Sequence, residues 1–113
     1  MRQDDDQKNE IYDDGYLRVE YANYYVACGG RPIYNLSRVE LLLFFTMVRN
    51  FERLVTHEAL WKAAWGKKTP YNVRTLRVQL SNLRLKLLPY GLNITTMVNV
   101  GYRLIRSNDE AAS

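Results

Sequence analysis

The chain has 113 residues and a mass of 13.3 kDa, which is enough for one domain and too little for two. Hydrophobic residues make up 47% and charged residues 25%, the balance of a globular domain, and no apolar run is long enough to cross a bilayer. The polar segment 1–9 does not resemble a signal peptide. The single cysteine, Cys28, can form neither an internal disulfide nor a cysteine-rich metal site. These features predict a cytoplasmic domain without metal or cofactor.

Charge is distributed very unevenly along the chain. Residues 1–14 carry two basic and six acidic side chains, a net charge of −4, whereas residues 15–106 carry 14 basic and four acidic ones, a net charge of +10. The first segment is predicted to be a flexible acidic tail or linker, and residues 107–113 a second flexible tail. Every charged side chain between Ala59 and Asn108 is basic. A field of one sign favours a polyanion as partner.

The first folded element is expected to be a small antiparallel sheet. Aromatic and β-branched residues fill segments 16–21 and 24–28, which Ala22-Asn23 separate and two glycines close, and this pattern predicts a hairpin. A third strand is expected over residues 32–36.

A long apolar helix follows. Ser37-Arg38-Val39-Glu40 has the pattern of a capping box, in which the serine hydroxyl and the glutamate carboxylate each accept from the other residue's backbone amide. The helix is expected to run to Arg49 and is apolar nearly all round, which predicts that it lies at the centre of the core.

Two further helices are predicted. Thr56 can cap a helix that runs to Trp65, and the loop after it contains Pro70, which disfavours helix in the preceding residue. A third helix is expected over residues 72–88. Two final strands, 93–97 and 100–105, flank a tight turn in which Asn99 can take a left-handed conformation. The predicted order is therefore β-β-β-α-α-α-β-β.

The third helix has one apolar stripe and one basic surface. Leu76, Leu80, Leu83 and Leu87 fall on a narrow arc of the helical wheel, the pattern of a helix docked on a core. All its charged residues are basic, and arginine, asparagine and short apolar groups suit the base edges of the DNA major groove. The outward arc carries Arg74, Val78, Ser81, Asn82 and Leu85, with Arg77 and Arg84 along one edge and Gln79 and Lys86 along the other.

Residues 15–106 resemble a known family. Their motifs are similar to those of the winged-helix DNA-binding domain of OmpR/PhoB-type response regulators. Two short segments, Leu76-Arg77-Val78 and Val100-Gly101-Tyr102-Arg103, are most similar to the KdpE branch of that family. The resemblance implies an α+β winged helix-turn-helix fold with an N-terminal antiparallel sheet, three helices and a C-terminal β-hairpin wing. The stretches that carry it are 36–41, 60–66, 74–87 and 100–104.

The resemblance also implies a function, sequence-specific binding of double-stranded DNA by the effector domain of a two-component transcriptional regulator. Helix 72–88 would enter the major groove and wing 94–105 would lie at the minor groove. Family members often bind direct repeats as pairs, so a homodimer on DNA is possible. Loop residues Lys67, Lys68, Thr69, Pro70 and Tyr71 are candidates to contact RNA polymerase. The candidate DNA-binding residues are Arg74, Thr75, Arg77, Val78, Ser81, Asn82, Arg84, Lys86, Thr96, Asn99 and Arg103.

The wing departs from the family pattern. Where many members place an arginine at the tip, this chain has Val98, so that Arg103 or Asn99 would have to read the minor groove or the reading would be weak. Asn99 stands where a glycine is usual, and asparagine tolerates the same turn. No receiver domain is expected within these 113 residues, so the chain is expected to be either an excised effector domain or a stand-alone relative.

Several single residues are expected to have structural roles. His57, the only histidine, is expected to have a surface or capping role, and Cys28, Trp61 and Trp65 are expected in the core. No pattern for catalysis, phosphate loops or metal binding occurs, so no enzyme is predicted. The alternative function is a winged-helix interaction module that docks an acidic protein. RNA binding is a third, weaker alternative, because the basic half lacks an aromatic platform.

Overall fold

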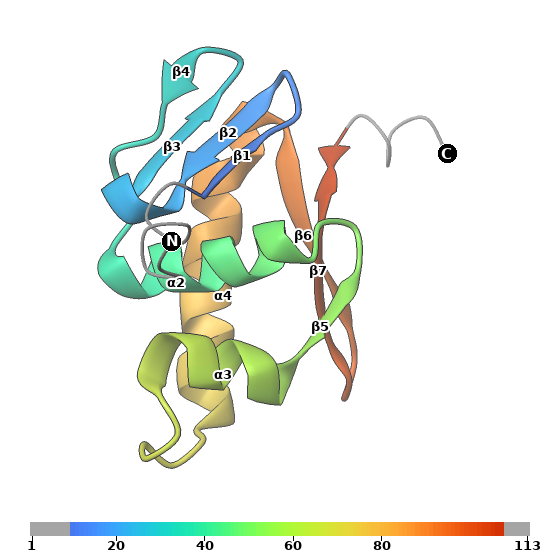
Figure 1. Ribbon diagram of the computed structural model, residues 1–113. Coiled ribbons are helices and arrows are strands. Elements are labelled where there is room, and N and C mark those ends of the chain that lie inside the picture. The colour runs from blue at the N-terminus through green and yellow to red at the C-terminus, as the bar shows by residue number, and fades with distance from the viewer. Residues whose placement is uncertain (1–9, 108–113) are drawn as a thin grey trace. The chain divides into compact units, whose positions relative to one another are not determined.

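The computed structural model describes residues 10–107, in two compact units that divide between Asn35 and Leu36 (Figure 1). The predicted tails therefore lie mostly outside the described residues. The exception is a strand, β1 (Ile11–Asp13), which lies inside the segment assigned to the acidic tail. The boundary expected at residue 14 is thus too late by at least four residues.

The first unit is an antiparallel sheet with the strand order β1-β2-β3-β4. Strand β2 (Leu17–Glu20) pairs with β1 and with β3 (Tyr25–Cys28), and the short β4 (Arg31–Pro32) pairs with β3. The predicted hairpin is present, although a short 3-10 turn, η1 (Tyr21–Asn23), joins its strands. The third predicted strand begins one residue earlier than expected and ends at Pro32, well before residue 36.

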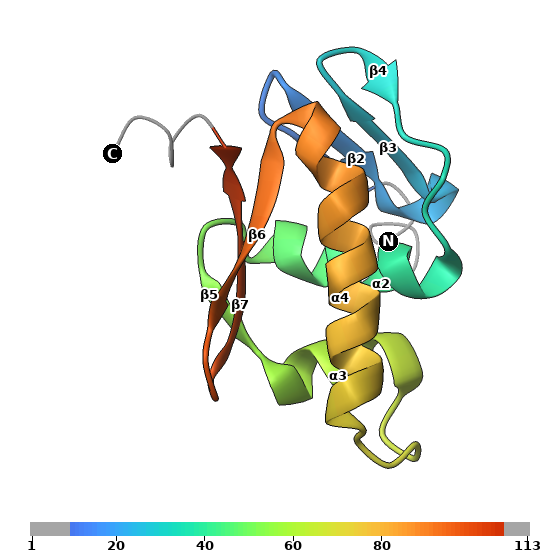
Figure 2. The same cartoon turned by 180° about the vertical axis from the view of Figure 1, so that it is seen from behind.

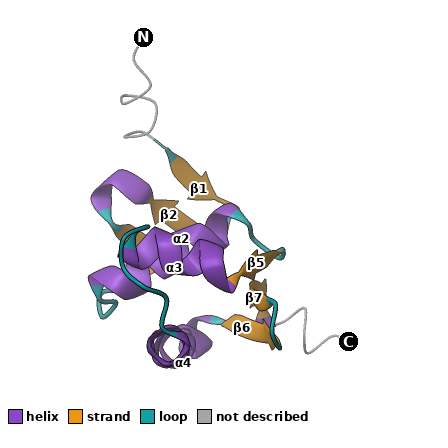
Figure 3. Ribbon diagram, turned by 90° about the horizontal axis from the view of Figure 1, so that it is seen from below, coloured by secondary structure: helices purple, strands orange, loops and turns teal. Residues whose placement is uncertain are grey.

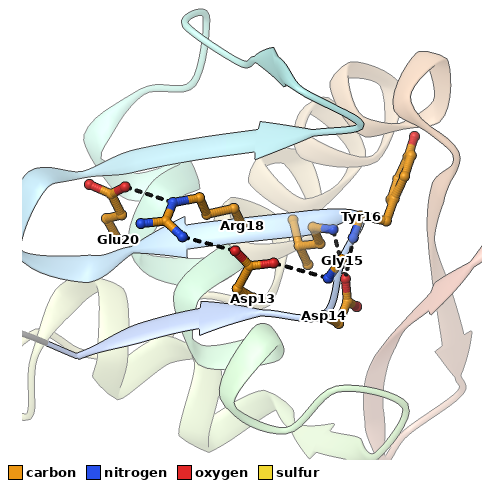
Figure 4. Close-up of polar contacts among 7 residues, drawn as sticks. Asp13, Asp14, Gly15, Tyr16, Arg18 and Glu20 are labelled. Atoms are coloured by element: carbon orange, nitrogen blue, oxygen red, sulfur yellow. Dashed lines mark hydrogen bonds and ion pairs between the residues drawn. The ribbon is translucent and has the colours of Figure 1, made fainter.

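Acidic side chains shape the turn between β1 and β2. The Asp13 carboxylate accepts from the Gly15 amide at 2.9 Å, and Asp14 accepts from the amides of Tyr16 and Leu17 at 2.9 and 2.7 Å. The Arg18 guanidinium bridges Asp13 and Glu20, each at 2.8 Å (Figure 4). Two of the acids predicted to lie in a tail therefore form a local turn.

The second unit begins with the predicted central helix, α2 (Arg38–Arg49). Both hydrogen bonds of its capping box are present, from the Glu40 amide to Ser37 Oγ at 3.1 Å and from the Ser37 amide to Glu40 Oε1 at 2.8 Å. Most of its apolar residues are buried, and they include Leu43, Phe44, Phe45, Met47 and Val48.

Helix α3 (His57–Trp65) has the predicted cap, Thr56, and the structure adds a cap for α4 (Val73–Leu87), the side chain of Asn72. All four leucines of the α4 stripe are buried. In Figures 2 and 3, α4 runs across α2 and α3, beside the β6–β7 hairpin. No helix within residues 10–107 is long and apolar enough to cross a membrane.

The wing is part of a three-stranded sheet with the order β5-β7-β6. Strands β6 (Leu92–Met97) and β7 (Gly101–Arg106) form the predicted hairpin, which a short 3-10 turn, η2 (Leu88–Tyr90), connects to α4. Strand β5 (Leu54–Thr56) was not predicted, and it pairs with β7 just before α3 begins. This pairing holds the start of α3 against the wing.

Candidate nucleic-acid interface

The outward face of α4 is open to solvent along its length. Its N-terminus carries no acidic residue in the first turn, so that the positive end of the helix dipole is not neutralised there. The Asn72 side chain caps this end by accepting from the Thr75 amide at 3.0 Å. Of the candidate DNA-binding residues between positions 74 and 82, Thr75 is half-buried, and the exposed ones are Arg74, Arg77, Val78, Ser81 and Asn82.

A groove separates α4 from the β6–β7 hairpin, and we call it the α4–wing groove. It consists of two adjoining hollows, of about 250 and about 460 Å³, that share Arg77, Thr96 and Tyr102. The first hollow is also lined by Ser81 and Arg84. The groove thus brings residues of the predicted recognition helix together with a residue of the predicted wing.

Arg84 connects the two walls of this groove. Its Nη1 atom donates to the backbone carbonyl of Ile94 in β6 at 3.2 Å, and its side chain remains exposed. The arginine therefore fixes the position of the hairpin relative to α4 while it keeps a solvent-facing positive charge.

Lys86 differs from the other predicted cations. Its ammonium lies 2.8 Å from Glu40 Oε1, and Glu40 is only 3% exposed. Burial of the carboxylate opposes its ionisation, but the hydrogen bonds from Lys86 and from the Ser37 amide outweigh burial and hold the pKa of Glu40 below its ordinary value. Lys86 therefore neutralises an acid of α2, and its contact with phosphate stays a prediction.

The wing residues divide between two faces of the sheet. Thr96 and Asn99 line the groove, and Asn99 has the left-handed conformation expected for it, with φ of 66°. Arg103 is exposed but follows the groove residue Tyr102 in β7, so strand alternation directs it to the opposite face. The structure therefore does not bring Arg103 into the groove.

Two aromatic residues that line the groove are absent from the candidates that the sequence provided. The rings of His57 and Tyr102 lie against each other, with centroids 5.3 Å apart, in the hollow that also contains Arg77. The pairing of β5 with β7 places them there, and β5 is the strand that the sequence did not reveal. The only available signal was the pair of adjacent β-branched residues, Val55 and Thr56.

The predicted polymerase-contact loop is packed against α3. Trp61 Nε1 donates to the Thr69 carbonyl at 2.9 Å, and the Thr69 hydroxyl donates to the Trp65 carbonyl at 3.0 Å. Trp61 stacks on Trp65 and meets the Tyr71 ring edge-on. Trp61 is buried as expected, whereas Trp65 is half-buried. Lys67 and Lys68 remain exposed on this anchored loop.

Within residues 10–107, no group of three or more histidine, cysteine, aspartate or glutamate side chains could hold a metal ion. Cys28 is buried in β3, as expected of a small core residue.

The helices, the sheet and the hairpin together define a winged-helix domain of the kind found in OmpR/PhoB-type regulators. Residues 30–104 match the family model described as "Transcriptional regulatory protein, C terminal", and the chain belongs to this family. The KdpE branch is not distinguished by the matches below.

Two curated relatives are regulators. The chain is 33% identical over 93 residues to the regulatory protein VanRB of Enterococcus faecalis, covering 82% of this chain and 41% of that protein. It is 31% identical over 98 residues to the response regulator ArlR of Staphylococcus saprophyticus, and the match covers 85% of this chain and 44% of that protein. The chain thus spans less than half the length of these relatives.

Solved structures support the same fold. The DNA-binding domain of RstA from Klebsiella pneumoniae, solved in complex with the RstA box, is 26% identical with a TM-score of 0.70 and covers 85% of this chain and 97% of that one. A second structure of the C-terminal DNA-binding domain of RstA is 28% identical, with a TM-score of 0.68, and the match covers 85% of this chain and 89% of that one.

Proposed function

We propose that this domain binds double-stranded DNA in a sequence-specific manner, with α4 in the major groove and the wing at the adjacent minor groove. The observation that carries the proposal is the outward face of α4, which is exposed, carries charge of only one sign and borders the α4–wing groove. The structure of the RstA domain on its DNA box and the regulator relatives support the same conclusion.

The side chains on this face have different roles in the proposal. Asn82, and Arg77 where it reaches a guanine, read base edges, because amide and guanidinium groups match adenine and guanine in the major groove. Arg74 and Arg84 hold phosphates, and Thr75, Val78 and Ser81 line the contact with the groove. Thr96 and Asn99 approach the DNA backbone from the wing.

The wider role of the chain follows from its relatives. We infer that it is the effector domain of a cytoplasmic two-component transcriptional regulator, with a kinship to the KdpE branch that rests on residues 76–78 and 100–103. Pairing on direct repeats and contact of RNA polymerase with the loop Lys67–Tyr71 belong to the same proposal. The anchored loop with its exposed lysines supports the second of these.

A salt titration tests the central claim. A duplex is selected from a random pool with the whole chain, and its affinity is measured over increasing salt. The logarithm of the affinity should fall with the logarithm of the salt concentration, by a slope of about −0.9 for each phosphate neutralised. Affinity that is independent of salt, or the absence of binding to any duplex at low salt, would refute the proposal. Retention of acidic proteins instead would favour the interaction module.

Two variants in the same titration separate the roles of the side chains. Asn82→Ala should relax the selected sequence and leave the salt slope unchanged, whereas Arg74→Ala should weaken all duplexes alike and reduce the slope by about 0.9. An unchanged consensus with Asn82→Ala would contradict the base-reading role.

A further inference from the structure

The tip of the wing is apolar and open to solvent. Val98 is 76% exposed and Met97 is 54% exposed, and Val100 on the other side of the turn is also exposed. No residue from Thr95 to Tyr102 carries a charge. The tip therefore lacks the cation that the negative potential of a minor groove would attract.

Folding of the hairpin does not account for these side chains. The ladder of β6 and β7 closes with Met97 opposite Gly101, and the turn beyond it depends on the left-handed Asn99 and on the bond from the Val100 amide to the Met97 carbonyl. The Val98 side chain contributes to none of these backbone interactions. Turns in soluble domains normally carry polar residues, and consecutive exposed apolar residues indicate a contact surface.

The position of the tip identifies what it contacts. Val98 and Asn99 line the same hollow as Arg77 and Thr96, and Val73 at the start of α4 lies across from them, half exposed. The tip and the first turn of α4 also lie at the same end of the unit (Figures 1 and 2). If a duplex is seated on α4 as proposed above, its backbone would lie at the α4–wing groove and its next minor groove would face Met97 and Val98.

We propose that Met97 and Val98 read this minor groove by apolar contact with deoxyribose and base edges, in place of a cation. The inference rests on the proposed function of α4. An apolar side chain can approach the floor of the groove at A·T pairs, whereas the 2-amino group of guanine projects into the groove at G·C pairs. The tip thus selects A·T pairs, and its contribution to affinity releases no counterions and does not depend on salt.

The first experiment separates apolar from ionic contact. With the selected duplex, Val98→Ser should weaken binding about three- to tenfold, the range expected for partial loss of one buried aliphatic group, with an unchanged salt slope. Val98→Arg should make the slope steeper by about 0.9. Because Val98 is so exposed, thermal unfolding of both variants should match the original chain and exclude misfolding as the cause.

The second experiment tests base selection at the groove floor. Hydroxyl-radical footprinting locates the sugars whose protection is lost in Val98→Ser, and the A·T pairs at that place are replaced by G·C or by inosine·C. Inosine lacks the 2-amino group but resembles guanine in the major groove. G·C should weaken binding about three- to tenfold and inosine·C should restore it, and Val98→Ser should remove this difference.

Each outcome has a defined meaning. Failure of the chain to bind any duplex refutes the proposed function. Salt-dependent binding that is unchanged in Val98→Ser, or equal affinity for G·C and inosine·C, overturns only the role of the wing tip. Loss of self-association in Val98→Ser without loss of DNA affinity would also overturn it, because the tip would then be a protein contact.

Discussion

Glu40 combines two tasks in one side chain. Its carboxylate accepts from the Ser37 amide, which completes the cap of α2, and from the Lys86 ammonium of α4. The carboxylate is nearly inaccessible, whereas about a third of the Lys86 side chain is exposed. Loss of the lysine would therefore leave a buried charge without its partner, and loss of the acid would leave a cation that can still reach water.

This asymmetry predicts unequal effects of two substitutions on stability. Glu40→Gln keeps a capping acceptor and should lower the free energy of unfolding by about 1–2 kcal/mol, whereas Lys86→Met should lower it by about 3 kcal/mol. Urea denaturation at neutral pH measures both values. Glu58→Gln, at an exposed site in the first turn of α3, is the control and should change stability by less than about 0.5 kcal/mol. Equal losses in the two variants would contradict the buried-charge argument.

The same pair makes stability depend on pH. Because folding lowers the pKa of Glu40, its contribution is complete above the ordinary carboxyl pKa of 4.5 and is lost as the pH falls through the lowered value. The difference in stability between the original chain and Glu40→Gln should therefore narrow only below about pH 4.5.

The loop between α3 and α4 is held by α3 itself. Trp61 anchors it through the indole nitrogen, and the stacked rings of Trp61 and Trp65 form the surface beneath it. A loop proposed to contact a partner is thereby presented in one arrangement, with its lysines directed outward.

Removal of this single hydrogen bond should release the loop. Trp61→Phe keeps an aromatic ring but cannot donate to the Thr69 carbonyl, so amides of residues 66–72 should exchange with solvent about fivefold faster or more, as expected for one lost hydrogen bond. Hydrogen exchange read by mass spectrometry measures the change. Trp65→Phe retains the Trp61 donor and should leave exchange in this segment much closer to that of the original chain. Equal acceleration in both variants would show that stacking, and not the bond, holds the loop.

The predictability of an element from sequence depended on its length and on the separation of its partners. Helix α4 was predicted because four leucines repeat at helical spacing over 15 residues. Strands β1 and β5 have three residues each, too few to show alternation, and β1 lies among acids typical of a solvated segment.

The candidate site followed the same rule. The outward face of α4 could be predicted as the complement of its buried stripe. The place of Tyr102 in the groove could not be predicted, because it depends on the pairing of β5 with β7. The pairing of Lys86 with Glu40 could not be predicted either, because the two residues lie 46 positions apart in the sequence. Contacts between residues far apart in the sequence decide where Tyr102 and Lys86 lie, and local sequence patterns contain no information about such contacts.

The net positive charge of the chain acts on a charged partner at a distance. Residues 59–108 carry nine basic side chains and no acidic one. Such a field accelerates association with a polyanion before any specific contact forms, and salt screens it at distances beyond about one Debye length.

Lys62 offers a test of this field, because it is exposed on α3 and is not among the residues that line the α4–wing groove. Lys62→Glu should slow association with the selected duplex severalfold at low salt, with a nearly unchanged dissociation rate, and the effect should shrink as salt is added. Stopped-flow fluorescence gives both rates, and Lys62→Gln should have about half the effect on the logarithm of the association rate. A faster dissociation with normal association would instead show direct contact of Lys62 with DNA.

The two bonds that flank the end of α4, from Arg84 to the Ile94 carbonyl and from Lys86 to Glu40, have a thermodynamic consequence. They hold the helix to the wing on one side and to α2 on the other before any duplex arrives. Association then requires no coupled folding of the reading element, and the heat-capacity change on binding reflects only the surface that the two rigid bodies cover. In this domain the helix loses its conformational entropy when the chain folds, and not when it binds DNA.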